Sequence, residues 1–535
     1  MSNQKVFSVN PSVSITRSKF KRPSMRKTTI KLGEITPIYL EQDMLPGDTW
    51  ITTLNSFIRM LNPVVPPMSS IFFDFYFFYV PNRLTFSHWK ELMGENQSSA
   101  GIFTGDEFTV PTVDLYNSGN DIVPGSLADH FGLPIVSQDP NKHLEVSVLP
   151  GRAYVLIYNE FFRDQNLIAP FPLALDDSRN ISPGKYAYHF FPLVAAKESD
   201  YFTRALPYAQ KGNPVSIPLG TQAPIKLLAG DIATGIVDGY VKPDSNITAH
   251  KTGTFSIVEA NGVSAGSHVG TLFTDLSNAT AATINSLRFA FQYQKVLEKD
   301  ALYGTRYWEI IKGHFGVTAP DASLQRPQLI GKWRQHIVVN QVVQTTGKGE
   351  TPSDNSLGSL AAVSSTFKGG MNFVHNSVEH GMIIGLAVAR HEQLYSQGVH
   401  RGWTRKTRND YYMPEYANLG AQSILNKEIF AQGSSADDEV FGYQEAWADY
   451  RYKPSTVTGY LRKSLANKFA PWTLSTNFGS LPTLSQSFIE QDRNAIKDLL
   501  GTGENGPDFL CDFYFDETMI RPMPLYSIPG LIDHH

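Results

Sequence analysis

The chain of 535 residues contains a single cysteine, Cys511. One thiol excludes an intramolecular disulfide and any zinc site built from several thiolates. The N-terminus lacks the apolar core of a signal peptide, and the longest clean apolar run in the second half, Met382 to Ala389, is far too short to span a membrane. These absences predict a soluble protein made in a reducing compartment or in one where disulfides are not needed.

Charged residues are also scarce, at 18%, whereas hydrophobic residues make up 41% of the chain. This balance excludes wholesale disorder, which needs few apolar residues and much charge. Aromatic residues are frequent, at 12%, and the chain has 41 Gly and 33 Pro. Many aromatics and many turn residues favour short strands joined by long loops, so the predicted fold is mainly β.

The small net charge of −4 hides a segregation of charge along the chain. Residues 1–33 carry eight Lys or Arg and no Asp or Glu, while the rest carries 38 basic and 50 acidic side chains. We interpret residues 1–33 as an extended, partly disordered arm, which is either a solvated terminus or a segment that binds a polyanion. The candidate DNA-facing residues of this arm are Arg17, Lys19, Lys21, Arg22, Arg26 and Lys27.

The strongest strand signal is the run Ile71 to Val80, which is nearly all aromatic or β-branched. Such a run is typical of a strand covered on both faces, and Asp74 within it then needs a partner. Further strands are predicted within Gln335 to Thr345, Gly381 to Ala389 and Phe509 to Phe515.

Helical spacing appears in only a few places. A short helix around Trp89 is predicted to start at Ser87, and helices are predicted from Asn285 to Ala301 and from Thr305 to Gly313; Ala153 to Phe162 fits a helix or a strand. Residues 211–285 are rich in Gly, Ala, Thr and Ser and indicate a surface insertion of short strands and loops.

No motif in the sequence indicates catalysis or a metal site. The pair His391-Glu392 lacks the second histidine of a zinc-protease motif, and Gly347-Lys348-Gly349 lacks the spacing of a phosphate loop. We therefore predict no catalytic residues, no metal and no cofactor. Carboxylate pairs that cleave glycosides stay open, because their spacing is spatial rather than sequential.

A second basic group interleaves cations with aromatic rings, as single-stranded nucleic acid requires. It consists of Arg401, Trp403, Arg405, Lys406 and Arg408, followed by Tyr411 and Tyr412. The alternative interpretation is a solvated loop with Trp403 anchored in the core.

Six blocks of sequence resemble the major capsid proteins of microviruses, in particular the gokushovirus branch. They are Phe77 to Arg83 with Trp89 following, Tyr158 to Asn166, Asp200 to Gly212, Gly304 to Tyr307 with Ile310 to Gly316, Leu425 to Ile429, and Gly442 to Ser455. The blocks follow the family order over most of the chain.

The resemblance implies an eight-stranded viral jelly roll with long loops, in a T=1 icosahedral shell with one copy per asymmetric unit. It implies a basic arm at 1–33, a jelly-roll core at 34–210 and 286–535, and an outward insertion at 211–285 that clusters at threefold axes. The expected partners are further copies of the chain, a single-stranded DNA genome, a small basic DNA-binding protein, a minor pilot protein and a host surface receptor. The family is not enzymatic, and its members assemble in the bacterial cytoplasm and reside in the virion. The alternative class is an all-β carbohydrate-binding or carbohydrate-active protein.

Overall fold

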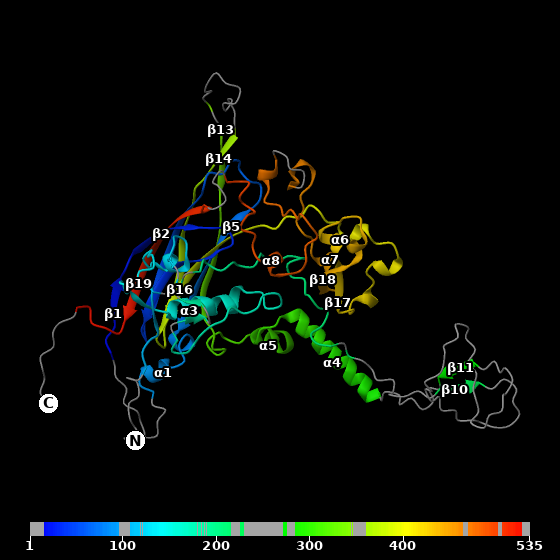
Figure 1. Ribbon diagram of the computed structural model, residues 1–535, viewed down its shortest axis with the longest axis horizontal. Coiled ribbons are helices and arrows are strands. Elements are labelled where there is room, and N and C mark those ends of the chain that lie inside the picture. The colour runs from blue at the N-terminus through cyan, green and yellow to red at the C-terminus, as the bar shows by residue number, and fades with distance from the viewer. Residues whose placement is uncertain are drawn as a thin grey trace, which may run out of the picture. The chain divides into compact units, whose positions relative to one another are not determined.

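The computed structural model (Figure 1) describes residues 15–95, 108–117, 119, 121–178, 180–182, 185–186, 188, 190–213, 215, 225–228, 271–274, 284–343, 345, 360–463, 469–500 and 506–526. The chain forms two compact units. The first comprises Met1–Ala209 and Ala301–His535, and the second comprises Gln210–Asp300.

Two antiparallel sheets make up the centre of the first unit. The sheet that we call the open sheet has the order β1-β19-β4-β15, with β2 also paired to β19; its strands are β1 (Ser18–Lys21), β2 (Ser24–Ile30), β4 (Thr49–Met60), β15 (Thr366–Asn376) and β19 (Phe509–Arg521). The covered sheet has the order β12-β5-β16-β3; its strands are β3 (Ile35–Met44), β5 (Ile71–Pro81), β12 (Gln328–His336) and β16 (Gly381–His391).

The connections between these strands follow a regular scheme. Successive strands β2, β3, β4 and β5 alternate between the two sheets, and β12, β15, β16 and β19 alternate again. Double-sheet jelly rolls of viral shells are built from eight strands in two Greek keys, and the observed order agrees with that connectivity. The prediction of a mainly β fold with few short helices is confirmed.

The main core lies between the two sheets. Phe73, Phe75, Phe77 and Tyr79 of β5 enter it, together with Phe513 of β19. The rings of Phe77 and Phe373 lie 4.3 Å apart, and those of Phe75 and Phe513 meet edge to face at 5.8 Å. Because successive strand residues point to opposite faces, every second residue of β5 serves this core.

The alternate residues of β5 pack on the other side of the covered sheet. Phe78 and Val80 belong to a second cluster that includes α2 (Leu127–Phe131) and α3 (Leu149–Ile157). The hydroxyl of Tyr154 in α3 donates to the carbonyl of Ile35 in β3 at 2.8 Å. The prediction that Ile71 to Val80 is covered on both faces is confirmed.

Asp74 in β5 is fully buried and has the partners that its burial requires. Arg334 donates to it from Nε at 2.7 Å and from Nη2 at 2.9 Å, and Arg390 donates from Nη1 at 2.7 Å. Burial raises the pKa of Asp74, but these bonds outweigh that effect and hold it below its ordinary value. The predicted need for a partner is confirmed.

Residues 18–30 differ from the tail expected there, because they form β1 and β2. Both strands pair antiparallel with β19, from Ser18 opposite Arg521 to Ile30 opposite Phe509. The sequence of β2 shows little apolar alternation, so its pairing with β19 rather than its own pattern determines the strand. The basic segment is therefore partly built into the open sheet.

The remaining elements of the first unit are short. The helices are α1 (Trp89–Leu92), α5 (Tyr307–Phe315), α6 (Asn426–Ile429), α7 (Ala448–Arg451) and α8 (Gln486–Ile489), and a π-helical turn (Tyr158–Phe162) continues α3. Two-stranded ribbons pair β6 (Thr112–Asp114) with β7 (Glu145–Ser147), β8 (Asn180–Ser182) with β9 (Lys185–Tyr186), β13 (Val339–Val343) with β14 (Leu360–Ser364), and β17 (Ala421–Leu425) with β18 (Val440–Glu445).

The two short predicted helices form where they are expected, but they begin or end at other residues than predicted. His88, not Ser87, precedes α1. Arg306, not Thr305, precedes α5, which continues past Gly313 and ends at Gly316 with φ of 71°. Ala153 to Phe162 is helical rather than extended.

The described part of the second unit holds one ribbon, β10 (Ile225–Leu228) with β11 (Thr271–Thr274), and most of α4 (Ile284–Tyr303). The helix predicted from Asn285 to Ala301 is confirmed. Most of the predicted insertion at 211–285 lies outside the described residues. Among the described helices, none is both long and apolar enough to cross a membrane.

Candidate nucleic-acid interface

The basic residues of β1 and β2 lie opposite carboxylates of β19. Lys21 Nζ lies 3.6 Å from Asp516 Oδ1, and Lys27 forms an ion pair with Asp512. Both lysines are well exposed, so these pairs contribute little to stability and leave the ammonium groups accessible to phosphates.

Two arginines of the same segment are held more firmly. Arg22 forms an ion pair with Glu41, and its Nη2 lies 3.1 Å from Glu517 Oε1. Burial lowers the pKa of Arg22, but the two carboxylates outweigh it and raise the pKa overall. Arg26 donates from Nη1 to the carbonyl of His130 at 2.7 Å. These two arginines therefore join β1 and β2 to the rest of the unit.

The two remaining predicted residues of this segment are exposed. A methyl group at Gly47 would lie 3.0 Å from Nη2 of Arg17, so Arg17 lies close to the turn before β4. Lys19 has no ion pair within the described part of the chain. No described carboxylate therefore neutralises the ammonium group of Lys19.

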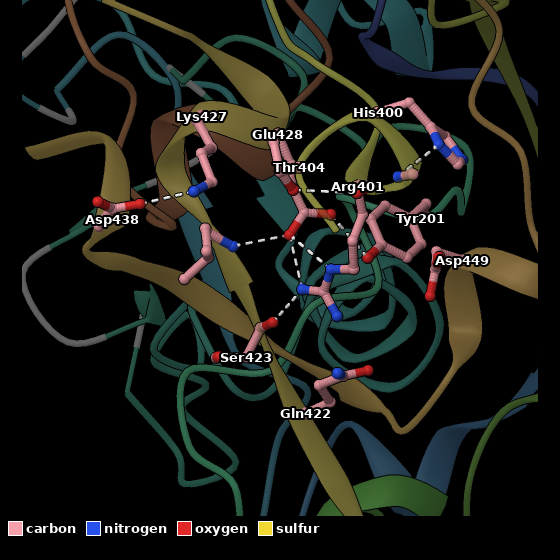
Figure 2. A network of polar contacts seen from close by, with 12 residues as sticks. Tyr201, His400, Arg401, Thr404, Gln422, Ser423, Lys427, Glu428, Asp438 and Asp449 are labelled. Atoms are coloured by element: carbon pink, nitrogen blue, oxygen red, sulfur yellow. Dashed lines mark hydrogen bonds and ion pairs between the residues drawn. The ribbon is translucent and has the colours of Figure 1, made fainter. Parts of the chain in front are cut away.

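The second basic group lies in the loop that precedes β17. Figure 2 shows the guanidinium of Arg401 against Glu428 of α6, with Nε at 3.1 Å and Nη2 at 2.6 Å from Oε1. Arg401 also donates to the carbonyl of Ser423. Glu428 is buried and accepts further bonds from the Leu425 amide and the Tyr201 hydroxyl. Arg401 therefore fixes the loop to α6 and β17, and it is not free to bind phosphate.

Arg405 is used in a similar way. It forms an ion pair with the buried carboxylate of Asp449 in α7. Its guanidinium also lies over two rings, 4.4 Å from the centroid of Tyr450 and 5.7 Å from that of Tyr411. Arg405 thus orients exposed aromatic rings but shares its charge with Asp449.

The other three residues of this group point to solvent. Trp403 is 85% exposed, and Lys406 and Arg408 are exposed as well. The interpretation in which Trp403 anchors the loop in the core is wrong. Trp447 does so instead: it is 6% exposed, and its Nε1 donates to the carbonyl of Tyr416 at 2.9 Å.

The two basic groups do not form one site. Figure 1 shows β1 and β17 at opposite sides of the first unit, and the ion pairs of each group stay within its own neighbourhood. Sequence reasoning missed Glu428 and Asp449, which neutralise two of the proposed DNA contacts. Both lie in the sequence blocks Leu425 to Ile429 and Gly442 to Ser455, so the blocks signalled their importance without revealing their role.

Two histidines, His391 of the incomplete zinc-protease motif and His375, have structural neighbours. His391 Nδ1 lies 2.7 Å from the carbonyl of Glu392, and the ring of His375 lies 4.3 Å from that of Tyr79. Burial lowers the pKa of both histidines to about 4. Within the described residues, no group of three or more His, Cys, Asp or Glu side chains could hold a metal ion.

Two antiparallel sheets whose strand order agrees with a jelly roll occur in viral shell proteins, and also in lectin domains and cupins. A sequence model of the family described as "Capsid protein (F protein)" matches residues 8–531, so the chain belongs to this capsid protein family. The predicted role as the major capsid protein of a small single-stranded-DNA phage is confirmed, over the carbohydrate-active alternative.

Curated relatives match nearly the whole chain. Capsid protein VP1 of Bdellovibrio phage phiMH2K is 40% identical over 99% of this chain and 98% of its own length. Capsid protein VP1 of Spiroplasma virus 4 is 36% identical over 97% and 96%, and that of Chlamydia phage 1 is 35% identical over 98% and 97%. The resemblance to microvirus capsid proteins is thereby confirmed. Members of a capsid family are structural proteins that assemble into a shell and reside in the virion.

Proposed function

We propose that this chain forms a T=1 icosahedral shell that encloses a single-stranded DNA genome and is not an enzyme. The observation that carries the proposal is the family match over residues 8–531, together with a strand order that agrees with a viral jelly roll. The shell assembles in the bacterial cytoplasm, around DNA that a small basic protein helps to condense and with a minor pilot protein.

The contacts to DNA come from cations that the structure leaves accessible. Lys19, Lys21 and Lys27 are exposed on the open sheet, and Lys406 and Arg408 are exposed beside Trp403. Exposed cations release counterions when they bind phosphates, whereas a cation already held by a buried carboxylate has little to gain. Arg22, Arg26, Arg401 and Arg405 act instead as positioning residues, and Arg17 is a further accessible contact.

The insertion at 211–285 projects outward near the threefold axes and contributes to host attachment by binding a surface receptor. What supports this is the separation of Gln210–Asp300 as a compact unit of its own. A separate unit inserted between β5 and β12 can vary without disturbing the two central sheets.

Electron microscopy of the purified protein tests the shell, and the mass of DNA per particle tests the contacts. Deletion of residues 1–27 would remove β1 and half of β2, so substitution is the sharper test. We expect the combined variant Lys19→Ala, Lys406→Ala and Arg408→Ala to form normal particles with less DNA, and Lys142→Ala, an exposed lysine elsewhere, to leave packaging unchanged. Absence of uniform particles from the unsubstituted protein would overturn the shell, and unchanged DNA content in the combined variant would overturn these contacts.

A further inference from the structure

The DNA contacts proposed on the open sheet use only its exposed lysines, and the other side chains on the outer face of this sheet have no role so far. On β19, Phe509, Cys511, Phe513 and Phe515 point inward and are buried, while their alternates point outward. The same alternation holds along β4, where Leu54 and Ile58 are buried and Ile51 is exposed. The outward residues are Lys19, Lys21, Met25, Lys27, Thr29, Ile51, Thr53, Asn55, Phe57, Arg59, Phe367, Asn372, Val374, Leu510, Asp512, Tyr514, Asp516 and Thr518, which we call the open face.

Three aromatic rings occupy neighbouring positions on the open face. Phe57 of β4 lies directly opposite Phe367 of β15 on one side and Asp512 of β19 on the other. Tyr514, two residues beyond Asp512, is diagonal to Phe57. Adjacent strands are about 4.8 Å apart, so the three aromatic side chains project from nearby positions on three neighbouring strands. Phe367 is 69% exposed.

Cations outnumber carboxylates on this face. Lys19, Lys21, Lys27 and Arg59 project from it, against Asp512 and Asp516. The guanidinium of Arg59 lies 5.0 Å from the centroid of the Phe57 ring, so one cation is already held beside a ring. An excess of positive charge on one face of a chain with a net charge of −4 indicates an anionic partner.

Polar side chains between the rings can form hydrogen bonds with bases. Thr53 Oγ1 donates to Asn372 Oδ1 at 2.7 Å, and Asn55 Oδ1 accepts from the amide of Gly370 at 3.2 Å. Both asparagines keep amide N–H donors on the same surface as the rings. Rings, amides and cations on one sheet face are the combination by which sheet domains bind single strands.

We propose that the open face is a stacking platform for single-stranded DNA, with bases on Phe57, Phe367 and Tyr514 and phosphates on Lys27 and Arg59. A second copy of the chain fits this surface less well, because lysine is depleted in protein interfaces and the rings here are separated by amides and charges. This inference rests on the proposed enclosure of DNA and names the surface that holds it.

Binding of a fluorescent oligothymidylate to the purified full-length protein is the first measurement. Each base stacked on a ring loses about tenfold in affinity when the ring is truncated, so the variant Phe367→Ala, Tyr514→Ala should bind about a hundredfold more weakly. Lys27→Ala should lower the slope of log affinity against log salt by about one. Phe315→Ala, which removes a ring 77% exposed on α5, is the matched control and should bind as the unsubstituted protein does.

The same variants in assembled particles separate this inference from the proposed function. We expect the double variant to assemble and to carry less DNA per particle. Particles of the double variant with full DNA content and unchanged oligothymidylate affinity would overturn the platform but leave the shell standing. Loss of assembly at unchanged affinity would also overturn it and identify the face as a contact between copies. A loss of affinity in Trp403→Ala but not in the double variant would place the DNA on the 401–408 loop instead.

Discussion

The two sheets of the first unit share one core, but the outer face is covered in one sheet and exposed in the other. In the covered sheet, Phe77 points into the core between the sheets, and Phe78 packs beneath α3 on the far side. In the open sheet, Phe513 points into the same core, but its neighbour Tyr514 faces outward. The first unit thus has one sheet that is covered on both faces and one sheet whose outer face carries exposed side chains.

The largest expected difference between the two sheets is the stability lost when one ion pair of each is removed. Asp74→Ala leaves Arg334 and Arg390 without their shared carboxylate, and removing one partner of a buried ion pair costs about 3–5 kcal/mol. Asp512→Ala removes the partner of the exposed Lys27 on the open sheet and should cost less than about 1 kcal/mol. Urea unfolding of the unassembled protein measures both. Equal losses for the two variants would show that the open face is covered.

The same difference can be tested with pairs of adjacent aromatic residues on one strand of each sheet. Phe77→Ala and Phe78→Ala should each lower the free energy of unfolding by about 3–5 kcal/mol, because both side chains are fully buried. Phe513→Ala should cost as much, whereas Tyr514→Ala should cost less than about 1 kcal/mol. The four urea midpoints give the comparison directly, and a large loss in Tyr514→Ala would contradict it.

The pH dependence of stability should have opposite signs at two buried carboxylates. Burial raises the pKa of Glu517 on the inner face of β19, although the Tyr39 hydroxyl and Arg22 oppose this effect. The folded state then binds a proton that the unfolded state has lost, so stability declines as pH rises from 4.5 to the raised pKa and is level above it. The pKa of Asp74 is lowered instead, so its contribution is present above pH 3.8 and is lost as pH falls through the depressed value.

These signs are tested by measuring the free energy of unfolding between pH 3 and pH 8 and subtracting the curve of each variant from that of the unsubstituted protein. Glu517→Gln should remove a decline in stability with rising pH, and Asp74→Asn should remove a loss of stability on acidification. Parallel curves for the unsubstituted protein and Glu517→Gln would refute the assignment to Glu517.

The covered sheet could be predicted from the sequence far better than the open one. Ile71 to Val80 is apolar at almost every position because both of its faces are buried, and this signal is local. The inward positions of β2 include Arg26 and Thr28, which carry no such signal, and the strand forms because β19, almost 500 residues later, pairs with it. Likewise, Arg401 and Arg405 resemble free cations until Glu428 and Asp449 are brought beside them by the fold.

Thiol labelling perturbs the protein least. It compares the accessibility of the two faces of β19 at the adjacent positions 510 and 511. Cys511 is buried in the core between the sheets, and burial raises the pKa of its thiol. It should react with a thiol reagent only through unfolded molecules, whose fraction is about 10⁻³ to 10⁻⁶ for a folded domain. Leu510 points to the open face and is exposed, so the cysteine in Leu510→Cys should react at once in the unassembled protein.

The same variant then connects the fold to the DNA. If the open face is a DNA platform, the Leu510→Cys thiol should be protected in DNA-filled particles and become reactive in particles emptied of DNA. Cys511 should stay unreactive in both, because its protection comes from the core and not from a ligand. Equal reactivity of the Leu510→Cys thiol in filled and empty particles would show that the open face does not contact the genome. Fast labelling of Cys511 in native protein would contradict the inward register of β19 itself.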